Sequence, residues 1–311
     1  MTTPPLAITG GTGFLGSHVL EQALAAGHRP LALTRRLGGA DFTSGRPQPL
    51  WVEGTLHDTA ALARLVDGAG AVLHIAGAVN VPTRADFAAA NIAGTRNVVE
   101  AARAAGITRL VHVSSLAARE PGLSDYGWSK AGAEDVVRDS GLDWTIIRPP
   151  AIYGPRDADM FEMFRAARLG VLPVPPAGAA SVIHAADLAG LLLAAAAGSG
   201  PDWRHKVFEP DDGRPGGWPH KALAGAIGAA MGRRVWAPGL PALLLRGAAR
   251  VDRMMRGDKA RLTPDRASYM LHPDWVSTPQ HAVPAHLWSP AIETPEGLAQ
   301  TAAWYRSNGW L

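Results

Sequence analysis

The sequence predicts an α/β fold in which a doubly wound parallel sheet is followed by a smaller, mostly helical region. Short apolar runs alternate with helical segments through the first 150 residues, and a glycine-rich turn follows the first of these runs. The alternation stops after Pro150, where proline and tryptophan become frequent. Strands this apolar, separated by helices, are typical of parallel sheets that are covered on both faces.

The elements follow in order along the first half of the chain. Their apolar periodicity and glycine stops predict six strands, at residues 5–11, 30–36, 50–54, 71–77, 109–115 and 143–150. Helical spacing predicts the intervening helices at residues 18–28, 59–69, 91–106 and 126–141. Ligands of such sheets bind beyond the carboxyl ends of the strands.

Two domains are expected. Residues 1–150 form the dinucleotide-binding domain, and residues 151–311 form the substrate-binding region, from which a strand and helix near residues 180–198 return to the first domain. Seven of the ten tryptophans lie beyond residue 200. The tryptophans and prolines suggest a fairly apolar substrate.

Composition excludes several classes of protein. The formal net charge is only +3 and no run of lysine and arginine exceeds two residues, so nucleic-acid binding is not expected. The chain has no cysteine, which excludes disulfides and thiolate metal sites. The histidines of the second half lack metal-ligand spacing, so no metal is expected. We expect a cytoplasmic protein, because no apolar run approaches the roughly 18 residues of a membrane span.

One segment mixes apolar and basic residues at helical spacing. It is "LPALLLRGAARVDRMMRG", residues 240–257. This pattern favours a surface helix with its arginines facing water over a helix that contacts a membrane surface.

The glycine-rich turn "TGGTGFLGSHV" lies between the first strand and the first helix. Glycines there permit a tight turn and let the backbone approach a pyrophosphate at the helix N-terminus, as in Rossmann-like folds. Because the motif stands at this junction, cofactor binding is favoured over a structural turn. The residues of the turn expected to bind cofactor are Gly10, Thr12, Gly13, Phe14, Leu15 and Gly16.

The end of the second strand points to NADP(H) rather than NAD(H). Proteins that bind NAD through this motif place an acidic residue there to bind the ribose hydroxyls. This chain has Thr34 followed by Arg35 and Arg36. Two guanidinium groups suit a 2′-phosphate, although a solvated charged loop is the alternative.

The stretch "SSLAAREPGLSDYGWSK" carries the candidate catalytic residues. Ser114 and Ser115 end the fifth strand, and Tyr126 and Lys130 are four residues apart, on one face of the next helix. A lysine ammonium beside a tyrosine would lower the pKa of the phenol from its ordinary value of about 10. A serine hydroxyl could hold the substrate oxygen. The pattern predicts a proton-transfer device.

With these blocks, the chain resembles the extended short-chain dehydrogenases/reductases of the NAD-dependent epimerase/dehydratase type. "TGGTGFLG", "HIAG", "NIAGTRNVV", "VSS", "YGWSK", "RPPAIYGP" and "VIHAADLA" match in order over nearly the whole chain. The resemblance implies that Tyr126 is the acid/base, that Lys130 also holds the nicotinamide ribose, and that Ser115, or else Ser114, steadies the substrate oxygen.

Further residues follow from the same resemblance. It implies that Ala76 and Gly77 line the cofactor and that Pro149 and Ile152 contact the nicotinamide. Thr55 stands where the family often has an aspartate near the adenine, so Thr55 and Leu56 are expected to contact it instead. Asn91 matches a motif residue that is either structural or part of a proton relay.

The function expected is NADP(H)-dependent interconversion of a ketone or aldehyde and an alcohol, a ketoreductase activity. Two alternatives stay open: a nucleotide-sugar epimerase with the same triad, and a non-catalytic NADP-binding sensor or assembly protein. Only ten residues separate Ser115 from Tyr126, and the acidic pair of sugar dehydratases is absent. Both features count against a nucleotide-sugar substrate. Family relatives often dimerise through the helices at 91–106 and 126–141, so a homodimer is expected.

Overall fold

The computed structural model describes residues 4–37, 48–257, 260 and 262–311, and divides the chain into two compact units. The first unit comprises Met1–Arg148 and Leu188–Phe208. The second comprises Pro149–Asp187 and Glu209–Leu311. Each unit has its own hydrophobic core.

The first unit is built on a seven-stranded parallel sheet. Its strands are β1 (Leu6–Thr9), β2 (Leu31–Thr34), β3 (Leu50–Glu53), β4 (Ala71–His74), β5 (Arg109–Val113), β6 (Asp143–Ile147) and β10 (Lys206–Phe208). They lie in the order β10-β6-β5-β4-β1-β2-β3, and each neighbouring pair of these strands is parallel. The strand order reverses at β1, which pairs with both β2 and β4. Ligands of open α/β sheets bind beside this switch point.

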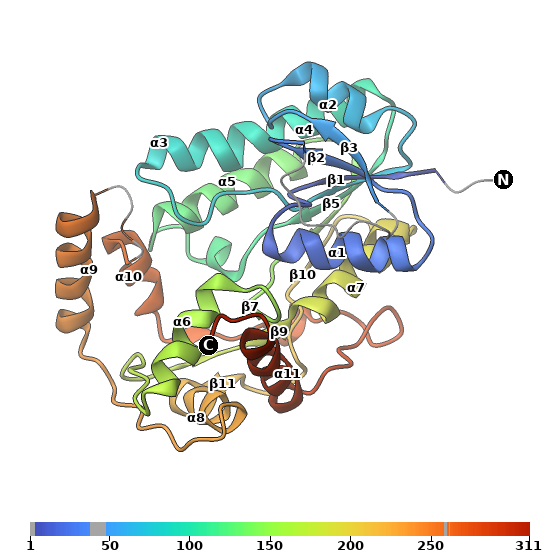
Figure 1. Ribbon diagram of the computed structural model, residues 1–311. Helices are drawn as coiled ribbons and strands as arrows, with labels where there is room; N and C mark the ends of the chain where they lie inside the picture. The colour runs from blue at the N-terminus through green and yellow to red at the C-terminus, as the bar shows by residue number, and fades with distance from the viewer. Residues whose placement is uncertain (1–3, 38–47, 258–259, 261) are drawn as a thin grey trace. The chain divides into compact units, whose positions relative to one another are not determined.

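Helices cover both faces of the sheet (Figure 1). Figure 1 shows α2 (Thr59–Val66), α4 (Gly94–Ala104) and α5 (Asp125–Arg138) over one face and α1 (Phe14–Ala25) with α7 (Ala185–Ala197) over the other. Valine, leucine and alanine fill the core, and every residue of β4 and β5 is buried. Burial on both faces explains why the apolar residues of β4 and β5 do not alternate with exposed polar ones. Their polar residues, His74, Arg109 and His112, are buried too.

The chain becomes helical seven residues before the expected start at residue 91. A capping box formed by Thr83 and Asp86 starts α3 (Arg84–Phe87), and a π-helical turn, η1 (Ala88–Ala93), joins α3 to α4. The capping box satisfies the first backbone N–H groups, so the helix begins there. Turns of π-helix are frequent at functional sites.

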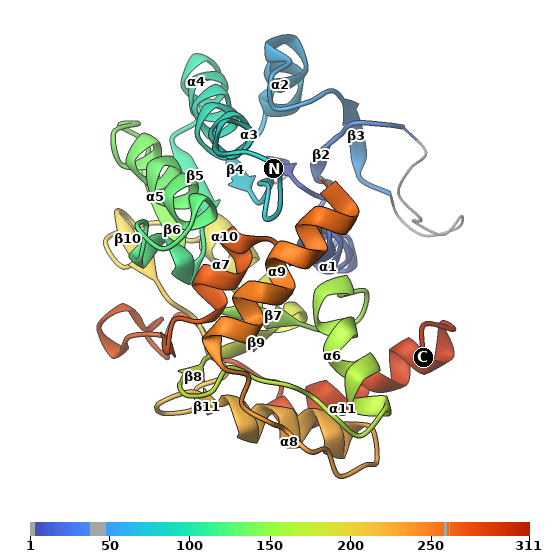
Figure 2. The same cartoon turned by 90° about the vertical axis from the view of Figure 1, so that its left-hand side faces the viewer.

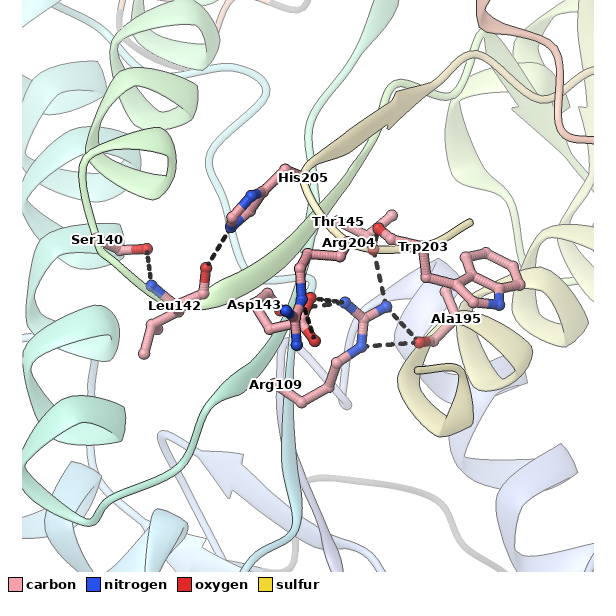
Figure 3. Close-up of polar contacts among 9 residues, drawn as sticks. All are labelled: Arg109, Ser140, Leu142, Asp143, Thr145, Ala195, Trp203, Arg204 and His205. Atoms are coloured by element: carbon pink, nitrogen blue, oxygen red, sulfur yellow. Dashed lines mark hydrogen bonds and ion pairs between the residues drawn. The ribbon is translucent and has the colours of Figure 1, made fainter. Parts of the chain in front are cut away.

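The strand β10 was not among the six strands expected from the sequence. Its backbone pairs with β6, and the segment that leads to it is tied to the sheet through Arg109, a buried side chain of β5 that Figure 3 shows beneath this segment. Arg109 donates hydrogen bonds to the Ala195 carbonyl oxygen at 2.5 and 3.1 Å and to the Thr145 hydroxyl at 2.8 Å. That hydroxyl in turn donates to the Trp203 carbonyl oxygen at 2.6 Å.

The second unit is less regular and rich in aromatic contacts. Two small sheets, β7 (Ala151–Tyr153) with β9 (Val182–His184) and β11 (Trp218–Pro219) with β8 (Ala179–Ala180) and β12 (Asp274–Trp275), are surrounded by helices. These helices are α6 (Ala158–Arg168), α8 (His220–Ala230), α9 (Ala242–Arg256), α10 (Pro264–Met270) and α11 (Thr294–Ser307). No helix among the described residues is long and apolar enough to cross a membrane.

Candidate active site

The glycine turn is compact because two of its glycines leave no room for a side chain. Gly10 has φ +77°, and a Cβ there would lie 2.6 Å from the backbone nitrogen of Ala76. A Cβ at Gly16 would collide with the carbonyl oxygen of Gly10. These two positions bring the start of α1 close to the ends of β1 and β4.

Gly13 has a different part in the turn. It is exposed at the N-cap of α1, where no side chain caps the helix and no acidic residue occupies the first turn. The first N–H groups of this 12-residue helix therefore carry partial positive charge that no side chain neutralises. The chemistry of this uncapped helix start suits a pyrophosphate. Thr12 is exposed and Phe14 half-buried, whereas the side chain of Leu15 lies in the core, so Leu15 can contribute only backbone.

Arg35 and Arg36 leave the sheet at the carboxyl end of β2, and both are exposed. The Thr34 hydroxyl donates a hydrogen bond to the Arg36 carbonyl oxygen at 2.9 Å and holds the turn. One carboxylate lies nearby, because exposed Glu53 ends β3 in register with Thr34. The neighbouring strand thus supplies an acid that the end of β2 itself lacks.

The residues expected to contact the cofactor from the loops after β3 and β4 differ in their exposure and packing. Thr55 is exposed and its hydroxyl accepts a hydrogen bond from the backbone of His57 at 3.2 Å. Leu56 instead packs beneath Gly94, where an added Cβ would approach its Cδ1 to 2.8 Å. Ala76 is half-buried and Gly77 exposed, beside the turn that contains Gly10.

Asn91, whose role the sequence left open, fastens the loop after β4 to α5. Its Oδ1 accepts a hydrogen bond from the Ala78 backbone at 2.7 Å. Its Nδ2 donates to the Ala78 carbonyl oxygen at 3.0 Å and to the Ser129 hydroxyl at 2.8 Å. The Ser129 hydroxyl donates to the carbonyl oxygen of Tyr126. Asn91 is therefore bound to structural partners on both sides of the site.

The two serines at the end of β5 have different partners. Ser114 is buried, and its hydroxyl donates a 2.5 Å hydrogen bond to the carboxylate of Glu134. Ser115 is half-buried, and its hydroxyl only accepts the backbone N–H of Ala117, at the start of a 3-10 turn (Leu116–Arg119). The hydroxyl hydrogen of Ser115 remains able to donate, so Ser115 is the better candidate to hold a substrate oxygen.

Tyr126 and Lys130 lie one turn apart near the start of α5. The ring of half-buried Tyr126 stands 6.1 Å from that of Phe87. Lys130 is buried, and its Nζ donates to the carbonyl oxygen of Val113 at 2.7 Å, directly at the end of β5. Burial lowers the pKa of Lys130 to about 8, although Glu134 opposes the shift.

Glu134 continues the same face of α5 by one more turn and ties the strand ends together. It is fully buried and accepts two hydrogen bonds of 2.7 Å from Arg148, which follows β6, and one from Arg138. Burial opposes ionisation, but these arginines and Ser114 hold the pKa of Glu134 below its ordinary value. The paired charge fixes the ends of β5 and β6 against α5.

A chain of buried hydrogen bonds connects β1 to η1. The Nδ1 of His74 lies 2.6 Å from the Thr9 hydroxyl, its Nε2 lies 2.9 Å from the Thr95 hydroxyl, and Thr95 donates to the Asn91 carbonyl oxygen. Burial, and then the Lys130 ammonium, lower the pKa of His74 to about 3. The same causes keep the pKa of His112, whose ring lies 5.2 Å away, well below its ordinary value. Both shifts favour the neutral imidazole beside Lys130.

Pro149 and Ile152 belong to the second unit. Pro149 is buried, and Ile152 pairs in register with Ile183 between β7 and β9. The described residues include no group of three or more acidic or histidine side chains that could hold a metal ion.

Sequence reasoning missed Glu134, Arg148 and His74. The spacing of Tyr126, Lys130 and Glu134, four residues each, was a signal for Glu134, because it places all three on one helix face. No comparable signal existed for His74, whose partners come from β1 and α4.

Comparison with known proteins bears on the family of the chain. Residues 10–197 match the NAD(P)H-binding family. A ceramide reductase of Caulobacter vibrioides is 36% identical over 98% of this chain and 96% of its own length. A 4-hydroxy-2-methyl-3-oxo-4-farnesyl-3,4-dihydroquinoline-1-oxide ketoreductase of Stigmatella aurantiaca is 31% identical over 67% of this chain and 68% of its own.

A solved structure extends the likeness to the whole fold. The UDP-N-acetylglucosamine 4-epimerase of Bacillus cereus superposes with a TM-score of 0.70 at 19% identity, over 98% of this chain and 97% of its own. At that identity the likeness concerns the fold alone. Because the family model spans more than half of the chain and reductase relatives exceed 30% identity, the chain belongs to the NAD(P)H-binding family and is an NAD(P)-dependent enzyme, in agreement with its resemblance to the extended short-chain dehydrogenases/reductases.

Proposed function

We propose that the chain interconverts a ketone and an alcohol with NADP(H), using Ser115, Tyr126 and Lys130. The observation that carries this proposal is the arrangement at the start of α5. There Tyr126 and Lys130 share a face, and the Lys130 Nζ is bound to the last carbonyl of β5, beside the two serines. The glycine turn after β1 and the uncapped N-terminus of α1 also suit the pyrophosphate of a dinucleotide.

Each residue of the triad has a distinct task in the reduction. Bound NADPH would supply the hydride. Tyr126 donates the proton to the carbonyl oxygen, and Ser115 steadies that oxygen by donating a hydrogen bond. Lys130 stabilises the tyrosinate that remains and, in this proposal, also binds the nicotinamide ribose.

The preference for NADP(H) rests on Arg35 and Arg36. Both guanidinium groups are exposed at the carboxyl end of β2, where a 2′-phosphate would lie. Glu53, on the neighbouring strand, is the acid that would favour NAD(H) instead. The positive charges of Arg35 and Arg36 outweigh the negative charge of Glu53, and this balance favours the cofactor with the 2′-phosphate.

The substrate we propose is a ketone on a long-chain lipid of the ceramide type. Two relatives support it: one is named for ceramide, and the other for a farnesyl-bearing ketone. The second unit, residues 149–187 and 209–311, would bind this substrate, as the region 151–311 was expected to do. The homodimer expected from the sequence stays a prediction that light scattering can check.

The proposal is tested by supplying the purified chain with NADPH and three substrates: a ketone-bearing ceramide analogue in detergent, a short-chain ketone, and UDP-glucose. We expect net oxidation of NADPH, with kcat/KM higher by about tenfold or more for the lipid ketone. Interconversion of UDP-glucose and its epimer without net oxidation would establish the epimerase instead. Tight NADPH binding with no turnover of any substrate would indicate the non-catalytic sensor.

A further inference from the structure

The helix α9 (Ala242–Arg256) has three chemically different faces. With about 3.6 residues per turn, Leu245 and Ala249 share one face, and Arg246, Arg250 and Arg253 share a second. The third face is apolar throughout and consists of Leu243, Leu244, Gly247, Ala248, Val251, Met254 and Met255. We call this third set the outer apolar face.

The outer apolar face is the one turned to solvent. Its five large side chains are between 50% and 82% exposed, and Met254 is the most exposed of them. The sequence favoured a surface helix with its arginines facing water over a helix that contacts a membrane surface. Arg246 and Arg250 are indeed exposed, and the structure shows that the apolar face is exposed as well.

Packing within the second unit fixes this orientation. Leu245 and Ala249 are buried in a small core with Ala267 of α10, against which Leu262, Met270 and Leu271 pack. The Asp252 carboxylate accepts the Leu262 backbone N–H at 2.9 Å, and Figure 2 shows α10 alongside α9. Turning α9 inward would expose the residues of this core, so the outer apolar face cannot be buried by rotating the helix.

Within α9, the charged residues along one edge of the outer apolar face are all positive. Arg246 and Arg250 are exposed along one of its edges, and Arg253 follows on the same line. The only acid of the helix, Asp252, lies on the packed side, where it pairs with Arg256 at 3.2 Å. An apolar face bordered by arginines complements a surface that is apolar inside and anionic at its edge.

We propose that α9 docks the protein on an anionic lipid bilayer, with the outer apolar face among the acyl chains and the arginines at the headgroups. Helices with this division lie in the plane of the membrane interface, and their arginines add affinity for anionic lipids. The transfer of leucine and methionine side chains from water to an apolar environment is favourable. The inference rests on the faces of α9 alone and does not require the proposed reaction.

The test measures binding of the full chain to vesicles that contain no ketone. Vesicles of phosphatidylcholine with roughly one third phosphatidylglycerol should bind the chain at least about tenfold more tightly than phosphatidylcholine alone. Raising the salt to about 1 M, where the Debye length is roughly 3 Å, should remove most of that difference. Flotation of vesicles with bound protein provides the readout.

Two variants locate the surface on α9. Changing Leu243, Met254 and Met255 together to serine should weaken binding by about tenfold or more. Arg246→Glu with Arg250→Glu should abolish the preference for phosphatidylglycerol. Neither variant alters Leu245 or Ala249, and NADPH binding and circular dichroism check that the chain remains folded. Leu169→Ser, as exposed as Met254 at 82%, is the matched control and should bind like the parent.

Three outcomes would overturn the proposal. The parent chain could fail to bind vesicles of either composition, or Leu169→Ser could weaken binding as much as the α9 variants. The serine variant could instead convert a dimer to a monomer without changing vesicle binding, which would make the outer apolar face an interface between two copies. Because no substrate is present, failure here leaves the reductase proposal unaffected.

Discussion

Glu134 of the first unit and Asp157 of the second are both buried carboxylates, and their pKa values shift in opposite directions. Glu134 in the first unit is fully buried with two arginines and a serine hydroxyl, which hold its pKa below the ordinary value despite burial. Asp157 in the second unit is nearly as buried, and there burial raises the pKa to about 7 against the hydrogen bonds of two backbone N–H groups.

The difference lies in the side chains that surround each carboxylate. Arg148 directly follows β6 and Arg138 lies one turn beyond Glu134, so both reach the same carboxylate. Asp157 caps α6, and its main partner is the backbone N–H of Asp159 at 2.8 Å. Burial disfavours a charged carboxylate unless cations compensate for the missing hydration. The first unit uses a buried charge to fix a site, whereas the second uses a buried carboxyl to begin a helix.

The largest expected effect is on turnover, when Tyr126 beside this site is replaced. We expect Tyr126→Phe to lower turnover by about 10²- to 10⁴-fold, because the ring would keep its volume but lose its proton. Thermal unfolding and NADPH affinity should stay near the parent values. Turnover close to normal on a good substrate would show that Tyr126 is only a surface residue of α5.

The two serines provide the control for that prediction. Ser115→Ala should lower turnover, though less than Tyr126→Phe, because Ser115 orients the oxygen without losing a proton. Ser114→Ala should instead cost about 1–3 kcal/mol of stability, since it removes a partner of a buried carboxylate. The reverse pattern would move the substrate contact to Ser114.

Removing the charge of Glu134 should also have a large effect, but on the stability of the fold rather than on turnover. Glu134→Ala would leave Arg148 and Arg138 without their shared carboxylate, and we expect a decrease of about 3–5 kcal/mol in the free energy of unfolding. Chemical denaturation provides the measurement. Arg138→Ala, which leaves the two Arg148 hydrogen bonds intact, is the milder control.

The pH dependence of that decrease follows from the sign of the shift. Because the folded pKa of Glu134 is depressed, its contribution is present above the unfolded value of 4.5 and is lost as pH falls through the folded pKa. The gap in stability between the parent and Glu134→Gln should therefore close in acid. A gap that widens in acid would contradict the pairing with arginine.

Exposed charges of the first unit should act on the cofactor and not on the fold. Replacing Arg35 and Arg36 by serine should weaken NADPH binding by about 1.5–3 kcal/mol for each charged hydrogen bond to the 2′-phosphate that the substitution removes, and spare NADH. Glu53→Gln is the matched control, because it removes a neighbouring exposed charge of opposite sign. Equal affinity of the parent chain for NADPH and NADH would refute the preference.

The smallest effect concerns the carboxylate of the second unit, and its sign is the opposite of that of Glu134. A raised folded pKa means that the free energy of unfolding falls as pH rises from 3.8 to about 7. Asp157→Asn should therefore be more stable than the parent by about 1–3 kcal/mol at about pH 8, and nearly equal at about pH 4. The exposed Asp159, changed to asparagine, should show no such pH-dependent gain.

The sequence was informative wherever a local pattern and the tertiary structure agree. The glycine turn, the first six strands and the shared face of Tyr126 and Lys130 each depend on residues close together in the chain, so spacing alone could predict them. The strand β10 has only three residues and exists because it pairs with β6. The helix starting at Arg84 was missed because its capping box was not recognised.

By itself, then, the sequence determined the fold class, the family and the residues that could perform proton transfer, since these follow from periodicity and motif spacing. Only the tertiary structure decided that Ser114 is engaged by Glu134 while Ser115 keeps a hydrogen to donate, and that Asn91 fastens a loop. It also decided which face of α9 is packed and which meets solvent. The physical reason is that a hydrogen-bond partner or a packed face depends on segments far apart in the chain, whose proximity no local pattern encodes.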